Sequence, residues 1–242
     1  MEASPSKPQA ALFDAYGTLF DVYSVATLAE KLFPGHGAAI SVLWRDKQIE
    51  YTRLVTTSND GAFYKPFSEL TRAALVYAIK KVAGYVYGSR PEGHFDSEYA
   101  GKIGQLVAQY KHLTAYPENR EVLLALKARG IQTGILSNGD PAMLQAVVAS
   151  SGLADVLDHV ISVDAVRKFK THPAAYALGE AACGLPAAKI AFVSSNSWDA
   201  LAATWFGYQT LWVNRQNMPF EELGTQPVKT GTSLRDVLSF FD

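Results

Sequence analysis

The chain has 242 residues, of which 48% are hydrophobic and 19% are charged, and its formal net charge is −1. This is the composition of an ordinary globular protein, and without a basic excess to neutralise phosphates we expect no nucleic-acid partner. Residues 1–9 are polar and no apolar stretch reaches the length of a membrane span, so we expect a cytoplasmic protein without a membrane partner. The single cysteine, Cys183, cannot form an intramolecular disulfide, and its neighbours predict a small core residue.

A short apolar run at residues 11–13 predicts a buried strand that ends at Asp14, and Gly17 then predicts a tight turn. In an open α/β sheet, ligands bind beyond the carboxyl ends of the strands, so Asp14 stands where chemistry usually takes place. A carboxylate there can serve as a nucleophile, a metal ligand or a general base. The alternative is that Asp14 only caps the turn, as aspartate often does.

Only helices are predicted from residue 22 to about residue 113. Apolar residues recur there at helical spacing, and the predicted helices cover residues 21–33, 40–55, 67–86 and 98–112. We therefore interpret residues 21–114 as a helical cap subdomain inserted after the first strand. A cap that follows the turn after Asp14 would lie over the carboxyl edge of the sheet and exclude water there.

Strands and helices alternate in the remaining chain. The predicted strands cover residues 131–136, 159–163, 189–193 and 210–213. The predicted helices cover residues 119–129, 141–151, 173–183, 199–206 and 233–241. This alternation predicts a parallel sheet with helices on both faces, to which the first strand also belongs. The predicted fold is therefore α/β, with a Rossmann-like parallel sheet core formed by residues 1–20 and 115–242 and an inserted helical cap.

Residues that can carry chemistry follow the predicted strands. They are Asp14 and Thr18, then Ser137, Asn138 and Gly139, then Lys170, and finally Ser194, Ser195, Asn196 and Asp199. Because the carboxyl ends of parallel strands share one edge, we expect these side chains at one site. Each group alone has a simpler explanation: Ser-Asn-Gly is a common turn, a lysine is usually solvated, and an aspartate often caps a helix. The combination, in this order, favours a site.

The four groups resemble the four motifs of the haloacid dehalogenase superfamily. The matching segments are residues 14–18 (DAYGT), residues 136–139 (LSNG), Lys170 with Pro173, and residues 194–199 (SSNSWD). Within the superfamily the chain resembles the type II L-2-haloacid dehalogenases, with supporting matches at residues 43–45, 206–208, 212–215 and 221–224. The resemblance extends from about residue 9 to residue 241. It implies the same α/β fold, no cofactor and a homodimer.

A Mg²⁺-dependent phosphatase of the same superfamily is the main alternative, and a non-catalytic relative is another. Such phosphatases use a second acid two positions after the nucleophile, where this chain has Tyr16, whose phenol has an ordinary pKa of about 10. They also bind Mg²⁺ through acids in the last motif, where this chain has Ser194 and Ser195 and keeps Asp199 as its only carboxylate. A halide leaves without protonation and needs neither feature. We therefore expect a dehalogenase without a metal.

The resemblance implies that Asp14 attacks C2 of a short L-2-haloalkanoic acid and forms an aspartyl ester, which water hydrolyses to a D-2-hydroxy acid. Lys170 and Thr18 would support the Asp14 carboxylate, Asp199 would act on the water, and Ser137 with Asn138 would bind the substrate carboxylate. The remaining predicted roles are halide binding by Arg45 and Asn196, apolar walls from Tyr16, Ile49, Phe67 and Trp198, and polar support from Tyr176 and Ser194.

Two departures from the family pattern bear on the expected pocket. Asp46 stands beside Arg45 where many relatives have a neutral amide, and an acid there could pair with that arginine. The segment 56–65 is also longer than usual, which affects the assignment of Phe67 as a wall residue. The acid could also reshape the pocket, so the first departure concerns the range of substrates, whereas the second concerns the assignment of Phe67.

Overall fold

The structure is a computed structural model that describes residues 7–82, 84 and 94–242. It divides into two compact units. The sheet unit comprises Met1–Asp21 and Ala115–Asp242, and the helical unit comprises Val22–Thr114. Of the helix predicted over 67–86, residues 83, 85 and 86 lie outside the described residues, and Gly84 forms a turn.

The sheet unit contains a six-stranded parallel sheet with the strand order β5-β4-β1-β6-β7-β8. The strands are β1 (Ala10–Phe13), β4 (Gln132–Ser137), β5 (His159–Ser162), β6 (Ile190–Ser194), β7 (Gln209–Val213) and β8 (Lys229–Gly231). The prediction of a parallel α/β sheet is therefore confirmed. The edge strand β8 was not predicted, because it is three residues long and has no apolar run.

Register in the sheet brings the strand ends together. Phe13 of β1 is level with Ile135 of β4 and with Val193 of β6. The next residue, Asp14, remains in the ladder through its N–H, which donates to the carbonyl of Val193 at 2.9 Å. All four residues of β1 are fully buried, as expected for a central strand with helices on both faces. Asp14 is thus the first polar side chain at the carboxyl end of the central strand.

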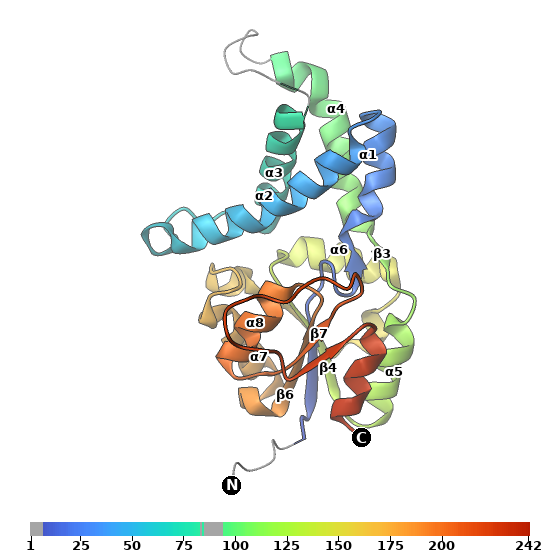
Figure 1. The fold of residues 1–242 in the computed structure, drawn as a ribbon, viewed down its shortest axis with the longest axis vertical. Helices are drawn as coiled ribbons and strands as arrows, with labels where there is room; N and C mark the ends of the chain where they lie inside the picture. Colours follow the sequence, from blue (N-terminus) through green and yellow to red (C-terminus); the bar gives the residue numbers. More distant parts are fainter. Residues whose placement is uncertain (1–6, 83, 85–93) are drawn as a thin grey trace. The chain divides into compact units, whose positions relative to one another are not determined.

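Helices cover both faces of this sheet (Figure 1), with α7 and α8 on one side and α5 with the C-terminal 3₁₀ helix on the other. Their bounds are α5 (Asn119–Ala128), α6 (Pro141–Ser151), α7 (Pro173–Cys183), α8 (Ser197–Phe206) and the 3₁₀ helix Leu234–Phe240. The segment predicted as a helix over 233–241 is therefore a 3₁₀ helix, which begins with a capping box at Ser233.

Local signals explain where several of these helices begin and end. Helix α6 begins with the side chain of Asp140 accepting the N–H of Met143, and it ends at Gly152, which has a left-handed φ of 68°. Helix α7 ends at Cys183, a buried free cysteine. Burial raises the pKa of the Cys183 thiol to about 11, which agrees with the prediction of a core residue.

The helical unit contains α1 (Ala26–Leu32), α2 (Gly37–Thr57), α3 (Phe67–Val82) and α4 (His94–Gln109). Short 3₁₀ helices cover Val22–Val25, Ser58–Gly61 and Tyr110–His112. Two short strands, β2 (Phe20–Asp21) and β3 (Thr114–Ala115), pair with each other at the two points where the chain passes between the units. Between them the described residues form helices and turns, as predicted. The polar segment after α2 turns through Asn59 and Asp60, both of which have positive φ.

Packing of α2 against α3 forms much of the interior of the helical unit. The indole N–H of Trp44 on α2 donates to the carbonyl of Thr71 on α3 at 2.7 Å. The centres of the Trp44 and Tyr110 rings lie 5.1 Å apart. Gly37 begins α2 against Glu30, where a β-carbon would lie 2.3 Å from the Glu30 backbone nitrogen. The Glu30 carboxylate accepts the N–H of Gly37 at 2.8 Å, which fixes this corner.

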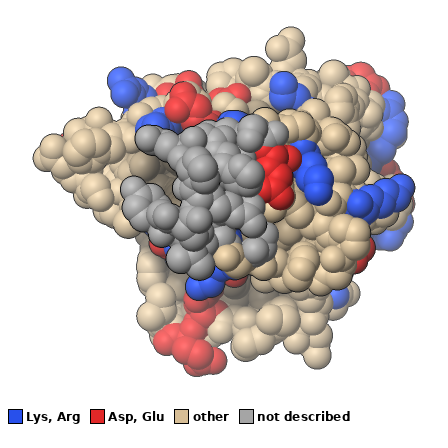
Figure 2. Space-filling view, turned by 90° about the horizontal axis from the view of Figure 1, so that it is seen from above, with Lys and Arg blue, Asp and Glu red and all other residues tan. Residues whose placement is uncertain are grey.

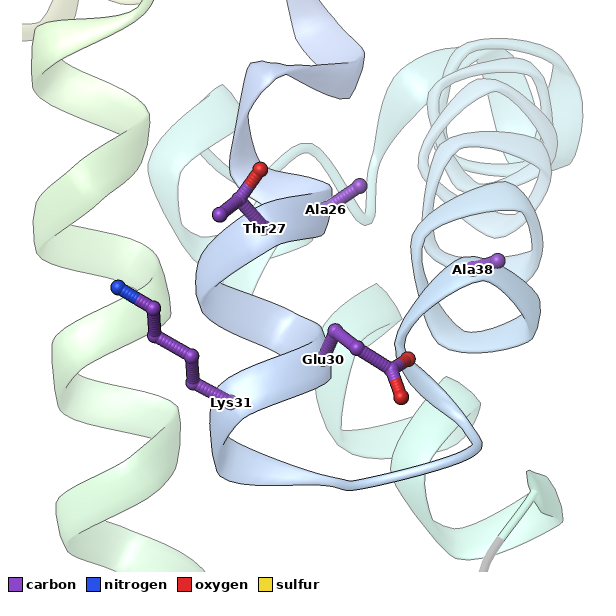
Figure 3. A pocket seen from close by; sticks show the side chains of 5 residues that line it. All are labelled: Ala26, Thr27, Glu30, Lys31 and Ala38. Atoms are coloured by element: carbon purple, nitrogen blue, oxygen red, sulfur yellow. The ribbon is translucent and has the colours of Figure 1, made fainter.

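A surface pocket of about 540 Å³ lies at the same corner (Figure 3), lined by Ala26, Thr27, Glu30, Lys31 and Ala38. None of these five is among the predicted site residues. On the face seen in Figure 2, basic and acidic side chains are interspersed, in keeping with the net charge of −1. Among the described residues, no helix is both long enough and apolar enough to span a membrane.

Candidate active site

Asp14 is held at the end of β1 by a turn that brings Thr18 back to it. The N–H groups of Leu19 and Phe20 both donate to the carbonyl of Ala15 at 3.0 Å. Gly17 has a φ of 96°, a conformation that L side chains rarely adopt, so glycine is needed at this position. The turn directs the Thr18 hydroxyl to Asp14 Oδ2 at 3.1 Å. The predicted turn glycine thus positions a side chain of the candidate site.

The two carboxylate oxygens of Asp14 have different partners. Oδ1 accepts from the Lys170 ammonium at 3.1 Å. Oδ2 accepts from Thr18 Oγ1 at 3.1 Å and from Asn196 Nδ2 at 2.7 Å. Asp14 itself is 5% exposed, so these contacts are made away from bulk water. One oxygen therefore faces a charge, and the other is held by two neutral donors.

Lys170 joins the two carboxylates of the site. Its ammonium is buried and contacts Asp14 Oδ1 at 3.1 Å and Asp199 Oδ2 at 3.0 Å. It also lies 4.8 Å from the centre of the Phe192 ring. The Lys170 N–H donates to Asn138 Oδ1 at 2.9 Å, which ties the segment after β5 to the loop after β4. A buried ammonium is costly unless it is paired, and here it has two anionic partners.

Asp199 lies in the first turn of α8 and is fully buried. Its Oδ1 accepts from the hydroxyl of Tyr176 on α7 at 2.7 Å. Burial raises the pKa of Asp199, Lys170 opposes that shift, and the negative charge of Asp14 adds to it, so that the pKa stays above its ordinary value. Burial and the Asp199 charge also raise the pKa of Tyr176 well above its ordinary value, which keeps its hydroxyl protonated as a donor.

The loop after β4 brings three predicted residues to the same edge. Ser137 Oγ accepts the N–H of Gly139 at 3.1 Å, while Asn138 is held through the Lys170 N–H. Tyr16 packs against this loop, because a β-carbon on Gly139 would lie 2.8 Å from its ring. Ser137 is fully buried, and Asn138 and Tyr16 are also buried. A larger residue than glycine at 139 would displace the Tyr16 ring.

The loop after β6 supports Asp14 from the other side. Ser194 Oγ accepts the N–H of Asn196 at 3.1 Å. Asn196 Nδ2 then donates both to Asp14 Oδ2 at 2.7 Å and to the Tyr16 carbonyl at 3.0 Å. Because one amide nitrogen has two hydrogens, halide binding by Asn196 would require one of these bonds to open. The structure thus brings Asn196 to the carboxylate of Asp14.

The surroundings of Asp14 do not fit a Mg²⁺ ion. Mg²⁺ requires a near-octahedral set of oxygen ligands with negative charge. Here the Asn196 amide, a donor, contacts Asp14 Oδ2 and the Tyr16 carbonyl, and the Lys170 ammonium contacts Asp14 Oδ1. Within the described part of the chain, no three His, Cys, Asp or Glu side chains form a possible metal site. Donors and a positive charge occupy the oxygens that a cation would need.

Three predicted site residues, Arg45, Ile49 and Phe67, belong to the helical unit. Arg45 and Ile49 are half-buried on α2, and Phe67 is buried at the start of α3. Asp46 is exposed and follows Arg45 directly, and neighbouring residues on a helix do not face each other. Trp198, in the first turn of α8 in the sheet unit, is half-buried.

A buried polar cluster that was not predicted surrounds Arg45. Arg45 Nη1 donates to Gln48 Oε1 at 3.3 Å, and the hydroxyl of Tyr110 donates to the same oxygen at 3.0 Å. Gln48 Nε2 donates to Thr71 Oγ1 at 2.6 Å. Burial raises the pKa of Tyr110, so its hydroxyl remains a donor. The contact between Arg45 and Gln48 could have been found from the sequence, because residues three positions apart are neighbours on a helix. The contact between Tyr110 and Gln48 could not, because the two residues are 62 positions apart and meet only in the folded chain.

Known proteins match this chain over most of its length. The model of the haloacid dehalogenase-like hydrolase family matches residues 8–207. The (S)-2-haloacid dehalogenase of Pseudomonas sp. (strain YL) is 41% identical over 230 residues, which cover 95% of this chain and 93% of the relative. This degree of identity across nearly the whole of both chains shows common family membership.

Two solved structures resemble this one closely. The L-2-haloacid dehalogenase RSc1362 is 49% identical, with a TM-score of 0.88 and coverage of 97% of this chain and 99% of the other. The L-2-haloacid dehalogenase from Xanthobacter autotrophicus with chloropropionic acid covalently bound is 35% identical, with a TM-score of 0.84 and coverage of 97% and 98%. The chain therefore belongs to the haloacid dehalogenase-like hydrolases and, among them, to the L-2-haloacid dehalogenase family.

Proposed function

We propose that the protein hydrolyses the carbon–halogen bond of short L-2-haloalkanoic acids and releases D-2-hydroxy acids, with Asp14 as nucleophile and without a metal ion. The observation that carries this proposal is the buried array in which the Lys170 ammonium contacts both Asp14 and Asp199, at 3.1 and 3.0 Å. The array offers one carboxylate for attack, a second carboxylate as base and a fixed positive charge between them. Family membership supplies the substrate class.

The first half-reaction is a displacement at carbon. Because Thr18 and Asn196 hold Oδ2 of Asp14, Oδ1 is the oxygen that attacks C2 of the substrate, from the side opposite the halogen. The new Oδ1–C2 bond forms as the carbon–halogen bond breaks, which inverts C2 and releases halide with the bonding electron pair. The leaving halide takes no proton, so no general acid is needed at the position of Tyr16.

The second half-reaction hydrolyses the resulting ester. Water attacks Cγ of Asp14 and passes a proton to Asp199, whose raised pKa makes its carboxylate a stronger base than an ordinary aspartate. Negative charge develops on Oδ2, where the Thr18 hydroxyl and the Asn196 amide already donate at 3.1 and 2.7 Å. Cleavage of the Cγ–Oδ1 bond then releases the hydroxy acid, which takes the proton from Asp199. The second proton of the attacking water leaves the Asp14 carboxyl group for solvent, which regenerates the carboxylate. The water oxygen remains in Asp14.

Binding of the substrate carboxylate is assigned to the loop after β4. Asn138 Oδ1 accepts from the Lys170 N–H, while its Nδ2 amide makes no hydrogen bond to the described residues and can donate to an anion. Ser137 Oγ accepts from Gly139 and keeps its own proton as a further donor. Two donors on adjacent residues suit the two oxygens of a carboxylate. This arrangement supports the predicted role of the pair.

The other predicted roles are part of the same proposal. Residues 21–114 would serve as the cap and the rest as the catalytic core, with Arg45 binding the halide with Asn196. The guanidinium of Arg45 offers several N–H donors to an anion, and one of its nitrogens donates to Gln48 Oε1. Tyr16, Ile49, Phe67 and Trp198 would form the apolar walls, and Tyr176 and Ser194 would hold Asp199 and Asn196. We also propose a homodimer, which sedimentation velocity tests directly.

Halide release tests the proposed function. Purified protein is incubated with L-2-chloropropionate, and chloride and product chirality are measured, with D-2-chloropropionate as the matched control. We expect chloride and D-lactate from the L isomer, activity that survives EDTA, and a much slower reaction of the D isomer. Failure to release chloride, together with Mg²⁺-dependent hydrolysis of p-nitrophenyl phosphate, would instead establish a phosphatase.

A further inference from the structure

The side chain of Arg215 joins separate segments of the sheet unit close to the candidate site. Arg215 lies two residues after β7. Its Nη1 donates to Ser195 Oγ at 2.7 Å, and its Nη2 donates to the carbonyl of Thr18 at 3.2 Å and to Glu118 Oε1 at 3.2 Å. The guanidinium carbon lies 3.8 Å from the centre of the Tyr116 ring. One side chain therefore ties together the loops after β1 and β6 and the segment before α5.

A short series of hydrogen bonds leads from Arg215 to the nucleophile. Ser195, held by Arg215 through its hydroxyl, donates its N–H to Thr18 Oγ1 at 2.8 Å. Thr18 Oγ1 in turn donates to Asp14 Oδ2 at 3.1 Å. Because Ser195 occupies an acceptor position of Thr18 Oγ1, the Thr18 proton is directed to Asp14. Arg215 fixes Ser195 and the Thr18 backbone together, and so fixes both residues on which this orientation depends.

The geometry requires an arginine. A guanidinium has five N–H donors in one plane, whereas a lysine ammonium is a compact charge that cannot reproduce the fork. Its charge is balanced by Glu118, and the two side chains are 17% and 9% exposed. Although burial acts to raise the pKa of Glu118, hydrogen bonds from the backbone and from Arg215 outweigh it and lower that pKa below its ordinary value. These hydrogen bonds therefore favour the ionised form of the Glu118 carboxylate beside the Arg215 guanidinium.

We propose that Arg215 is a positioning residue for the dehalogenation reaction: it holds Thr18 and Ser195 so that the Thr18 hydroxyl fixes Asp14 Oδ2 and leaves Oδ1 to attack. Among the described residues, Arg215 donates to Ser195, Thr18 and Glu118 and not to Asp14 itself. The inference rests on the proposed function and extends it to a residue outside the four motifs. It predicts that loss of Arg215 slows the chemical steps rather than weakening substrate binding.

Steady-state and single-turnover kinetics of Arg215→Ala on L-2-chloropropionate test this role. We expect kcat and the single-turnover rate of chloride release to fall on the order of tenfold to a hundredfold, as for a misplaced reacting group, while KM stays close to the wild-type value. Arg215→Lys should recover only part of the rate. Arg235→Ala is the matched control, because Arg235 forms an exposed bidentate pair with Glu121 and should leave kcat unchanged.

A double-mutant cycle with Thr18→Val separates positioning from general damage. If Arg215 acts through Thr18, the losses in kcat caused by Arg215→Ala and Thr18→Val will be strongly non-additive. Additive losses, an unchanged kcat, or a raised KM at constant kcat would overturn the proposal. Thermal melting monitors folding of each variant.

Ser195→Ala provides a second route should Arg215→Ala fail to fold. It removes the hydroxyl that accepts from Arg215 Nη1 but keeps the backbone N–H that donates to Thr18. We expect a smaller fall in kcat that is again non-additive with Thr18→Val, and an unchanged kcat would contradict the proposal. The assay of the wild-type protein distinguishes failure of the proposed function from failure of the role proposed for Arg215. An inactive wild type refutes the proposed function and with it this inference, whereas an active wild type with an equally active Arg215→Ala variant refutes the role of Arg215 alone.

Discussion

The ammonium of Lys170 and the carboxylates of Asp14 and Asp199 form a buried cluster with one more negative than positive charge. Such a cluster is stable only because each ion has close partners. Burial raises the pKa of Asp199, Lys170 opposes that shift, and the negative charge of Asp14 adds to it. During the proposed reaction Asp14 becomes a neutral ester, which removes one negative charge beside Lys170. The site is therefore closer to charge balance in the ester state than at rest.

The pH dependence of the reaction follows from the state of Asp199, which must be ionised to accept a proton from water. Burial raises its pKa, and the Tyr176 hydroxyl counters part of that shift by donating to the carboxylate at 2.7 Å. Tyr176→Phe removes this donor, so the pKa of Asp199 rises further. We expect the acid limb of the kcat–pH profile to move to higher pH, with the largest loss of activity at low pH.

Tyr208→Phe is the matched control for that measurement. The Tyr208 hydroxyl donates to the backbone carbonyl of Tyr176 at 2.5 Å and does not bond to Asp199. Its removal should affect stability but leave the acid limb in place. An acid limb that does not move in Tyr176→Phe would mean that Asp199 is not the group whose ionisation limits the rate.

In helix α5, the position of a leucine along the sequence determines whether its side chain is buried. Leu123 and Leu126 are fully buried, whereas Leu124, between them, is 47% exposed. Leu123→Ala should lower the free energy of unfolding by about 2–5 kcal/mol, since it removes buried methyl groups and leaves a cavity. Leu124→Ala should change it by no more than about 0.5 kcal/mol. Urea denaturation of both variants measures the difference, and equal losses would contradict the described packing of α5.

Elements with strong local signals could be predicted from the sequence. Helices α6 and α7 have the predicted bounds, because a proline starts each and a glycine with positive φ follows each. Strand β8 could not be predicted, since its pairing with β7 depends on the backbone and its three residues carry no apolar pattern. The last helical segment is 3₁₀ rather than α, a distinction that periodicity over a short run does not resolve.

Across the sheet unit, parallel topology explains why the side chains of the candidate site could be predicted to meet. Residues that follow parallel strands meet at one edge, and Thr18, Lys170 and Asn196 all contact Asp14 in the structure. Contacts made by loops between distant segments could not be predicted. Arg215 meets Thr18 across 197 positions of the chain, and that contact depends on the conformation of two loops.

The proposed reaction depends on a covalent ester of Asp14 whose carbonyl carbon is attacked by water. Single-turnover hydrolysis of L-2-chloropropionate in ¹⁸O water, with protein in excess, tests it most directly. We expect the peptide containing Asp14 to gain ¹⁸O while the D-lactate of the first turnover carries none. Label in the first-turnover lactate, with an unlabelled Asp14 peptide, would mean that water attacks C2 directly and that no ester forms on Asp14.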